Sequence, residues 1–205
     1  AILSIDVLTG DVVRMFKNDG INITDMDYSI PSTVMVLDTN SNGFVDKVYV
    51  GDLGSQMWRL GKFTNSFGSP LGFPNIDENI DNWEAHRILV VDPGHEKKFF
   101  YPPTVGLEKG YDLVLMGTGD RQDACSKTTY DGIYAVKDYH TGATFGLSDL
   151  VDVTNPAATP PNLDDSAGDV DVNGHIDQGW YILLNQGEKV LAEGVLFYKA
   201  FYLSL

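Results

Sequence analysis

One short segment of the chain carries oxygen-bearing side chains at regular spacing. Positions 1, 3, 5 and 9 of this segment are Asp38, Asn40, Asn42 and Asp46. In a calcium loop of the EF-hand type, such alternate side chains converge on one ion, a glycine at position 6 permits the sharp turn, and the backbone carbonyl at position 7 adds a ligand. Here position 6 is Gly43 and position 7 is Phe44. The spacing therefore predicts a Ca²⁺ site in residues 38–46.

The end of this segment differs from an EF-hand. Position 12 is Tyr49 instead of the bidentate glutamate, so we expect Asp46 to close the site. The residues that follow, 47–50, have the composition of a strand and not of a helix. We therefore predict a shortened calcium loop on a β scaffold. The alternative is an Asn/Gly turn that binds no ion.

The same spacing occurs a second time. Asp169, Asp171, Asn173 and Asp177 stand at positions 1, 3, 5 and 9. Gly174 is at position 6, the carbonyl of His175 is at position 7, and position 12 is Trp180. A strand-like run again follows. This second loop comes after a proline-rich segment, and the spacing predicts a second Ca²⁺ site there.

The sequence predicts that short strands position these loops. β-Branched and aromatic runs, separated by Gly, Asn and Asp, dominate the chain, whereas helical periodicity is scarce. The clearest runs are 34–37, 47–50, 88–91, 113–116, 133–136, 180–184 and 195–198. Segments 65–83 and 153–168 are predicted to be loops because they are rich in Gly, Pro and Asn. We predict a single all-β domain over residues 1–205.

A weak internal repeat organises the strands. In four places a strand runs into a turn that holds a glycine: Gly10, Gly54, Gly142 and Gly187. We expect each glycine to supply a positive φ and a second strand to return antiparallel. Several of the repeats start roughly one propeller blade apart, about 40–50 residues. The pattern favours blades of a β-propeller over unrelated hairpins.

The charge excludes several kinds of partner. The chain has 14 Lys and Arg against 29 Asp and Glu, a net charge of -15. Such a surface repels phosphate backbones and anionic membrane faces, so we expect neither nucleic acid nor membrane as a partner. No apolar run approaches the length of a membrane span. Cys125 is the only cysteine, so no disulfide can form within the chain.

We assign structural roles, and no catalytic or metal-binding role, to the other polar and aromatic residues. The run 117–121 lacks the Gly-Lys-Ser/Thr ending of a phosphate loop, and we predict a turn with an Asp120–Arg121 pair. The four histidines show no metal-ligand spacing and are predicted to lie at the surface: His86, His95, His140 and His175. The three tryptophans are predicted to be blade core: Trp58, Trp83 and Trp180.

With these residues assigned, the chain resembles the propeller domain of the PilC/PilY-type type IV pilus assembly proteins and tip adhesins. The most specific stretch is 37–60, where the first calcium loop leads into a strand, Gly51-Asp52-Leu53-Gly54, and then Trp58-Arg59. Further stretches follow in the order of the family, at 101–105, 114–121, 132–138, 179–182 and 187–193. The resemblance covers nearly the whole chain.

The resemblance implies a quinoprotein-like propeller, of which this chain would be a partial one with about four blades. It implies Ca²⁺ in the first loop and an exported protein in the periplasm or outer membrane, at the cell surface or at the pilus tip. It also implies a non-enzymatic role in pilus biogenesis, adhesion and twitching motility. The implied partners are minor pilins or the pilus tip, with any host or surface ligand held by regions outside this chain. The second loop is not in the matched pattern and rests on spacing alone.

Two alternatives stand beside this interpretation. Quinoprotein propellers include quinone-dependent dehydrogenases that use calcium, but the sequence shows no cluster of a catalytic carboxylate with residues to clamp the quinone acid groups. The other alternative is a structural, calcium-stapled β domain of a different surface protein, which would share the metal and the fold but not the pilus.

Overall fold

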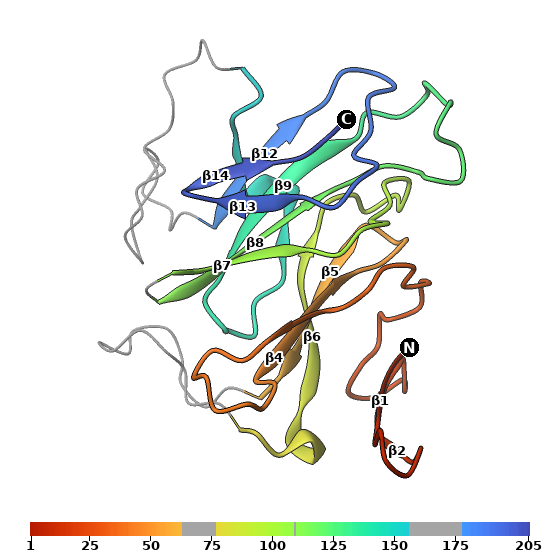
Figure 1. Ribbon diagram of the computed structural model, residues 1–205. Coiled ribbons are helices and arrows are strands. Elements are labelled where there is room, and N and C mark those ends of the chain that lie inside the picture. The colour runs from red at the N-terminus through yellow and green to blue at the C-terminus, as the bar shows by residue number, and fades with distance from the viewer. Residues whose placement is uncertain (63–76, 109, 156–177) are drawn as a thin grey trace.

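The computed structural model describes residues 1–62, 77–108, 110–155 and 178–205, and in this part of the chain the fold is all-β (Figure 1). The helical elements described are two three-residue 3-10 helices, η1 (Ile80–Asn82) and η2 (Leu147–Asp149). The prediction of an all-β fold is therefore confirmed. The second predicted calcium loop, 169–177, lies outside the described residues.

Two five-stranded sheets and two hairpins hold the strands (Figure 1). The first sheet has the order β10-β6-β5-β4-β3, with β3 (Met35–Leu37), β4 (Lys47–Gly51), β5 (Gln56–Gly61), β6 (Glu84–Val90) and β10 (Phe145–Gly146). The second has the order β11-β12-β9-β8-β7, with β7 (Thr104–Glu108), β8 (Tyr111–Gly117), β9 (Gly132–Asp138), β11 (Val151–Asp152) and β12 (Gly179–Leu183). The N-terminal hairpin pairs β1 (Ile2–Ile5) with β2 (Val12–Phe16), and the C-terminal hairpin pairs β13 (Val195–Phe197) with β14 (Ala200–Tyr202).

Each five-stranded sheet consists of four antiparallel strands and one short parallel strand. The parallel strands both come from the segment between β9 and β12. β10 pairs with β6, placing Phe145 opposite Leu89, and β11 then pairs with β12, placing Val151 opposite Trp180. This segment, residues 139–152, therefore contacts both sheets, and we call it the crossing segment.

The repeat analysis is only partly right. Gly10 (φ 79°) and Gly187 (φ 87°) have the positive φ expected of them. At the other two turns the positive φ belongs to Ser55 (φ 66°) and His140 (φ 58°), not to a glycine. Return strands form after β1 and β4, but after β9 the chain becomes the crossing segment, and no strand in the described residues returns along β12.

Apolar side chains of both large sheets share one core. It contains, among others, Tyr49 and Met57 of the first sheet and Val114 and Tyr134 of the second, with Phe99 between them in the chain. A second cluster packs the N-terminal segment against the first sheet and buries Trp58 and Trp83, as predicted. Trp180 is only partly buried and packs against a third, smaller cluster.

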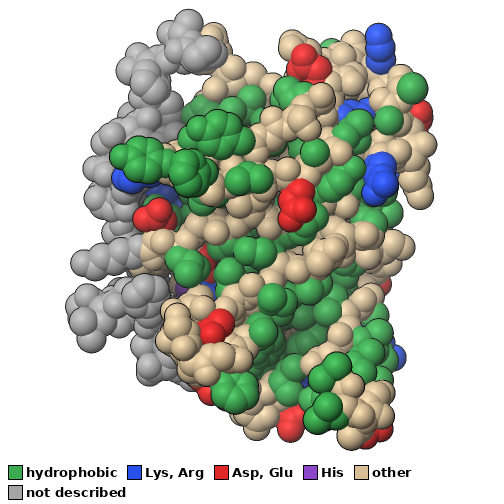
Figure 2. Space-filling model, viewed as in Figure 1, with side chains coloured by type: hydrophobic (Ala, Val, Ile, Leu, Met, Phe, Trp, Pro, Cys, Tyr) green, Lys and Arg blue, Asp and Glu red, His purple; other side chains and the backbone are tan. Residues whose placement is uncertain are grey.

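Both hairpins leave large apolar side chains in contact with solvent, and these side chains gather over β1–β2 and β13–β14 (Figure 2). On the N-terminal hairpin and its turn they are Leu3, Ile5, Val7, Leu8, Val12, Val13 and Met15, and on the C-terminal hairpin they are Val195, Phe197, Tyr198 and Tyr202. Contiguous exposed apolar surface of this kind marks a face that a partner or a further element would cover.

A buried ionic network joins the two sheets. Lys47 Nζ lies 2.5 Å from Asp112 Oδ2, and Arg59 Nη1 lies 2.6 Å from Asp138 Oδ1. The Tyr49 hydroxyl lies 2.7 Å from a carboxylate oxygen of each aspartate. Both cations belong to the first sheet and both carboxylates to the second, so these two ion pairs cross between the sheets.

His140 completes this network. Its Nε2 lies 3.0 Å from Asp112 Oδ2, and its backbone N–H donates to Asp138 Oδ1 at 2.9 Å. The side chain is buried, at 3% exposure, so the prediction that all four histidines lie at the surface is wrong for His140. The sequence could not show this because the partners of its ring, Asp112 and Lys47, are distant in the chain.

The network sets the protonation of its acids. Burial raises the pKa of Asp138, but the Arg59 guanidinium, His140 and the hydrogen bond from Tyr49 together outweigh burial and hold that pKa well below its usual range. Burial likewise raises the pKa of Asp112, and the hydrogen bond from His140 and the ammonium of Lys47 outweigh it, so this pKa is also lowered. Burial and the two nearby carboxylates raise the pKa of Tyr49. Both aspartates are therefore ionised at neutral pH.

Asp138→Asn should strongly destabilise the fold, because it leaves the buried Arg59 guanidinium without its carboxylate. Breaking a buried pair in this way costs about 3–5 kcal/mol. The matched control is Glu84→Gln, which breaks the ion pair of Glu84 with Lys62, where the Glu84 side chain is 67% exposed. The control should cost less than about 1 kcal/mol. Urea unfolding of both variants measures the difference, and equal losses would contradict it.

The lowered pKa of Asp138 predicts that the loss of stability in Asp138→Asn depends on pH. The folded-state pKa of Asp138 is lowered, so its contribution is present above the unfolded aspartate pKa of about 3.9 and is lost as pH falls through the folded value. The difference in unfolding free energy between wild type and Asp138→Asn should therefore hold from neutral pH down to about pH 4 and shrink below it.

Candidate metal centre

The first predicted calcium loop connects two neighbouring strands of the first sheet. β3 ends at Leu37 and β4 begins at Lys47, and these two residues are paired opposite each other. Next to this pair, the Asp46 N–H donates to the Leu37 carbonyl at 2.8 Å. The sheet therefore holds the two ends of residues 38–46 together.

Within the loop, the predicted ligand residues lie close together. The Asp38 carboxylate accepts the N–H groups of Asn42 (3.2 Å) and Gly43 (2.8 Å). The Asn40 amide oxygen accepts the Asn42 N–H at 3.0 Å, and the Asn42 amide oxygen accepts the Phe44 N–H at 2.9 Å. Short polar side chains that bond the backbone two to five residues ahead wind a loop tightly. The structure thus brings the predicted residues of positions 1, 3 and 5 into one turn.

Two residues of this turn have left-handed backbone conformations. Ser41 has φ 59° and Gly43 has φ 91°. Glycine at position 6 meets the conformational demand that the calcium-loop spacing predicts. The Phe44 side chain is 65% exposed, so only its backbone carbonyl is relevant to the predicted site.

Asp46 lies at the base of the loop and is fully buried. Its Oδ2 accepts the Thr39 N–H (2.5 Å), the Thr39 hydroxyl (2.7 Å) and the Asn40 N–H (3.3 Å). Its Oδ1 is buried and has no hydrogen-bond partner in the part of the chain described. A buried carboxylate oxygen without a partner is costly, and a cation would satisfy it. The loop therefore fits a hard cation.

The donor set favours one class of metal. No group of three or more His, Cys, Asp or Glu in the described residues could hold a metal, and the loop itself combines two carboxylates with amide and backbone oxygens. All of these are oxygen donors, which suit Ca²⁺ or Mg²⁺ and not Zn²⁺ or iron.

One carboxylate near the loop was missed in the sequence. Glu78 Oε1 accepts a short hydrogen bond from the Asn42 amide and lies 3.4 Å from the Asn40 amide nitrogen. Glu78 precedes η1, within the segment 65–83 predicted only as a loop. No spacing rule connects it to residues 38–46, because it is brought there by the pairing of β6 with β5 beside β4.

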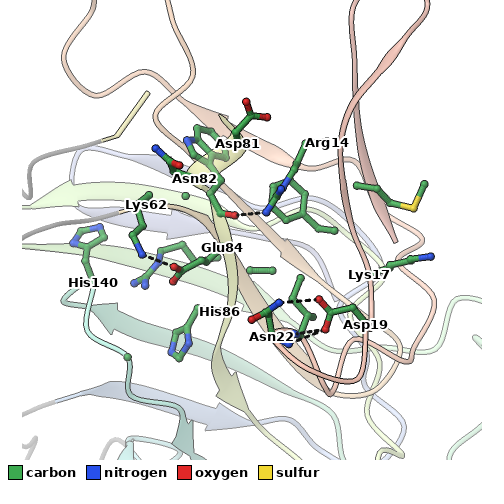
Figure 3. A pocket seen from close by; sticks show the side chains of 18 of the residues that line it. Arg14, Lys17, Asp19, Asn22, Lys62, Asp81, Asn82, Glu84, His86 and His140 are labelled. Carbon is green, nitrogen blue, oxygen red and sulfur yellow. Dashed lines mark hydrogen bonds and ion pairs between the residues drawn. The ribbon is translucent and has the colours of Figure 1, made fainter. Parts of the chain in front are cut away.

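A separate cavity of about 860 Å³ opens between the N-terminal segment and the first sheet (Figure 3). Its charged lining is mixed. Lys62 pairs with Glu84, the Arg14 guanidinium donates to the Trp83 carbonyl at 3.2 Å, and Asp19 accepts from Asn22. Because cationic and anionic side chains both line the cavity, it shows no preference for one ligand class.

Two smaller predictions need correction or comment. Asp120 pairs with Lys98 at 2.5 Å and not with Arg121, whose guanidinium lies 6.0 Å from the centre of the Tyr101 ring. Cys125 is exposed. In the described segments no helix is long and apolar enough to cross a membrane.

No protein-family model and no curated protein matches this chain. Among solved structures, the crystal structure of the Pseudomonas aeruginosa PilY1 C-terminal domain is similar, with a TM-score of 0.67 at 18% sequence identity. The chain has the fold of that domain. The match covers 98% of this chain and 49% of the PilY1 chain, so this chain spans about half the length of its structural neighbour. The resemblance inferred from the sequence is confirmed at the level of the fold.

Gly43→Ala should destabilise the protein, because an alanine at this position would have to keep a φ of 91°. The added Cβ itself would meet no atom within 4 Å. A left-handed conformation costs a non-glycine residue about 1–2 kcal/mol. Gly142→Ala is the matched control, since its Cβ also meets nothing within 4 Å and its φ is not positive. The control should be neutral or slightly stabilising. Thermal unfolding of both variants tests this, and a neutral Gly43→Ala would show that the loop is not held as described.

Proposed function

We propose that this chain is a non-enzymatic, calcium-binding β-propeller segment of a type IV pilus assembly or adhesion protein. The observation that carries the pilus assignment is the shared fold with the PilY1 C-terminal domain along 98% of the chain. The calcium assignment is supported by the wound loop and by the buried, unpartnered Oδ1 of Asp46.

In the first loop, calcium would be held by Asp38, Asn40, Asn42, the Phe44 carbonyl and Asp46. When bound, the ion supplies positive charge that removes the repulsion between the two carboxylates. The chain's own contribution is to hold these oxygens in place through the Asx-type hydrogen bonds and the β3–β4 pairing. By spacing alone, we propose a second site at Asp169, Asp171, Asn173, the His175 carbonyl and Asp177.

The propeller part of the proposal rests on architecture. Each large sheet contains an antiparallel four-stranded meander, the form of a propeller blade. In the described residues there are two such sheets and two hairpins, which would correspond to about four blades, complete or incomplete. The exposed apolar faces of the hairpins are where further blades would pack, in keeping with a chain that spans 49% of its neighbour.

The cellular part of the proposal follows from the neighbour. We place the protein outside the cytoplasm, in the periplasm or outer membrane, at the cell surface or at the pilus tip. Its partners would be minor pilins or the pilus tip. It would support pilus biogenesis, surface adhesion and twitching motility.

Calcium should raise the thermal unfolding midpoint, and chelator should lower it. An ion that binds only the folded state stabilises it by about 2.7 kcal/mol at a hundredfold excess over Kd. Magnesium should stabilise less, because it demands tight octahedral geometry and gives up its waters reluctantly. Asp46→Ala should lose most of the response assigned to the first loop. An unchanged midpoint with chelator, together with no metal at residues 38–46, would refute the calcium assignment.

Cells that lack the full-length protein should show fewer surface pili and reduced twitching. Complementation with the wild-type gene should restore both, and a gene carrying Asp46→Ala should restore them incompletely because the loop is impaired. Electron microscopy of surface pili and the diameter of twitching zones provide the measurement. Normal piliation and motility in the deletion strain would contradict the pilus assignment.

A further inference from the structure

The first loop contains a chemically labile pair of residues. Asn42 is followed by Gly43, and both are exposed to solvent. In an asparagine–glycine pair, the glycine backbone nitrogen can attack the side-chain amide carbon, because glycine has no Cβ to obstruct the approach. Among the described residues, a Cβ added at Gly43 would meet no atom within 4 Å, so the fold leaves open space beside this glycine. Neither burial nor crowding therefore prevents the reaction.

The reaction is a deamidation. A bond forms between Gly43 N and Asn42 Cγ, the bond from Cγ to Nδ2 breaks, and the nitrogen leaves as ammonia with the proton that Gly43 N has lost. Water then opens the cyclic imide at one of its two carbonyls. The products are aspartate, with the original backbone, and isoaspartate, in which the backbone runs through the side-chain carbons. Both products carry a carboxylate in place of the neutral amide.

Hydrogen bonds in the structure oppose this ring closure at both reacting groups. The Gly43 N–H donates to Asp38 Oδ2 at 2.8 Å, and the Asn42 Cγ must take the place of this hydrogen when the ring closes. The Asn42 amide oxygen accepts the Phe44 N–H at 2.9 Å. The Asn42 amide nitrogen donates a short hydrogen bond to Glu78 Oε1. The amide is thus held at its oxygen and at its nitrogen.

One of these contacts comes from outside the loop. Asp38 and Phe44 belong to the loop itself, whereas Glu78 lies 36 residues beyond Asn42, ahead of η1. Its acceptor is a carboxylate oxygen, and a hydrogen bond to a charged acceptor is stronger than one between neutral groups. Glu78 is therefore the contact through which another segment of the fold acts on the amide.

We propose that Asn42 is a deamidation site and that Glu78 sets its rate by holding the side-chain amide away from the Gly43 nitrogen. This inference goes beyond the proposed function, and it does not require that the loop binds calcium. While the contact with Glu78 is in place, Asn42 persists. When the contact is lost, deamidation proceeds and leaves a new carboxylate between Asp38 and Asp46 in the sequence.

The first measurement compares the folded protein with a synthetic peptide of residues 36–46. Both are incubated at neutral pH with chelator, so that no cation occupies the loop, and peptide mapping by mass spectrometry follows the conversion of Asn42 to aspartate and isoaspartate. The folded wild type should convert about tenfold more slowly than the peptide, a difference of about 1.4 kcal/mol in the barrier. Equal rates would overturn the proposal. A faster rate in the folded protein would also overturn it, because the contacts would then assist the attack.

Two substitutions of Glu78 separate its hydrogen bond from its charge. Glu78→Ala removes the acceptor, and the conversion of Asn42 in the folded protein should accelerate about tenfold. Glu78→Gln keeps an acceptor oxygen at the same reach, and its rate should stay within about threefold of wild type. The matched control is Asp81→Ala, which removes an exposed carboxylate from η1. The Asp81 side chain accepts no hydrogen bond within the described residues, so this variant should leave the rate unchanged.

Thermal unfolding of each variant establishes that it is folded at the incubation temperature. Glu78 is exposed, so Glu78→Ala should remain folded. A folded Glu78→Ala that converts Asn42 at the wild-type rate would show that the assignment of Glu78 is wrong. Acceleration by Glu78→Gln or Asp81→Ala as large as that by Glu78→Ala would also contradict it, because loss of charge near the loop would then explain the effect. If Glu78→Ala is unfolded, the comparison of the wild type with the peptide decides the proposal.

Discussion

The buried ion pairs between the sheets are the contact on which the rest of the structure depends. Lys47 and Arg59 from the first sheet meet Asp112 and Asp138 from the second, all at 5% exposure or less. Removing such charges from water is costly, so each is tolerated only where its partner is held in good geometry. The arrangement of the two sheets in the structure is one that satisfies these charges. The apolar core that contains Tyr49 and Tyr134 is formed by side chains of both sheets.

The candidate metal loop is attached directly to this network. Asp46 is the last residue of the loop and Lys47 the first residue of β4. Neighbouring residues of a strand point to opposite sides, so the carboxylate and the ammonium serve two different sites from adjacent positions. A shift of β4 by one residue would move Asp46 out of the loop and Lys47 away from Asp112 together. The register that satisfies the ion pairs is thus also the one that forms the metal loop.

What could be predicted from the sequence was local. The loop of residues 38–46 could be recognised because its ligands are near neighbours, and the strand runs could be recognised because their composition reports them directly. The contacts of Glu78 with Asn40 and Asn42, and of His140 with Asp112, could not be predicted, since the partners are separated by many residues in the chain. The positive φ of Ser55 could not be predicted either, because the turn also holds Gly54, to which the positive φ was assigned. Gly54 is required for a different reason, since a Cβ there would lie 2.1 Å from the Tyr28 ring. The two-residue strands β10 and β11 are too short to leave a pattern.

The crossing segment has a consequence for how the chain is made. β10, the edge strand beside β6, is synthesised only after β7, β8 and β9. Until Gly146 has emerged, the first sheet remains one strand short, and β6 presents unpaired backbone groups of the kind that pair with the wrong chain. Pairing across such sequence distances also slows folding. The first sheet can therefore be completed only after three strands of the second sheet, β7, β8 and β9, have been synthesised. A nascent chain stalled before residue 145 should be more prone to aggregate than one released a few residues later.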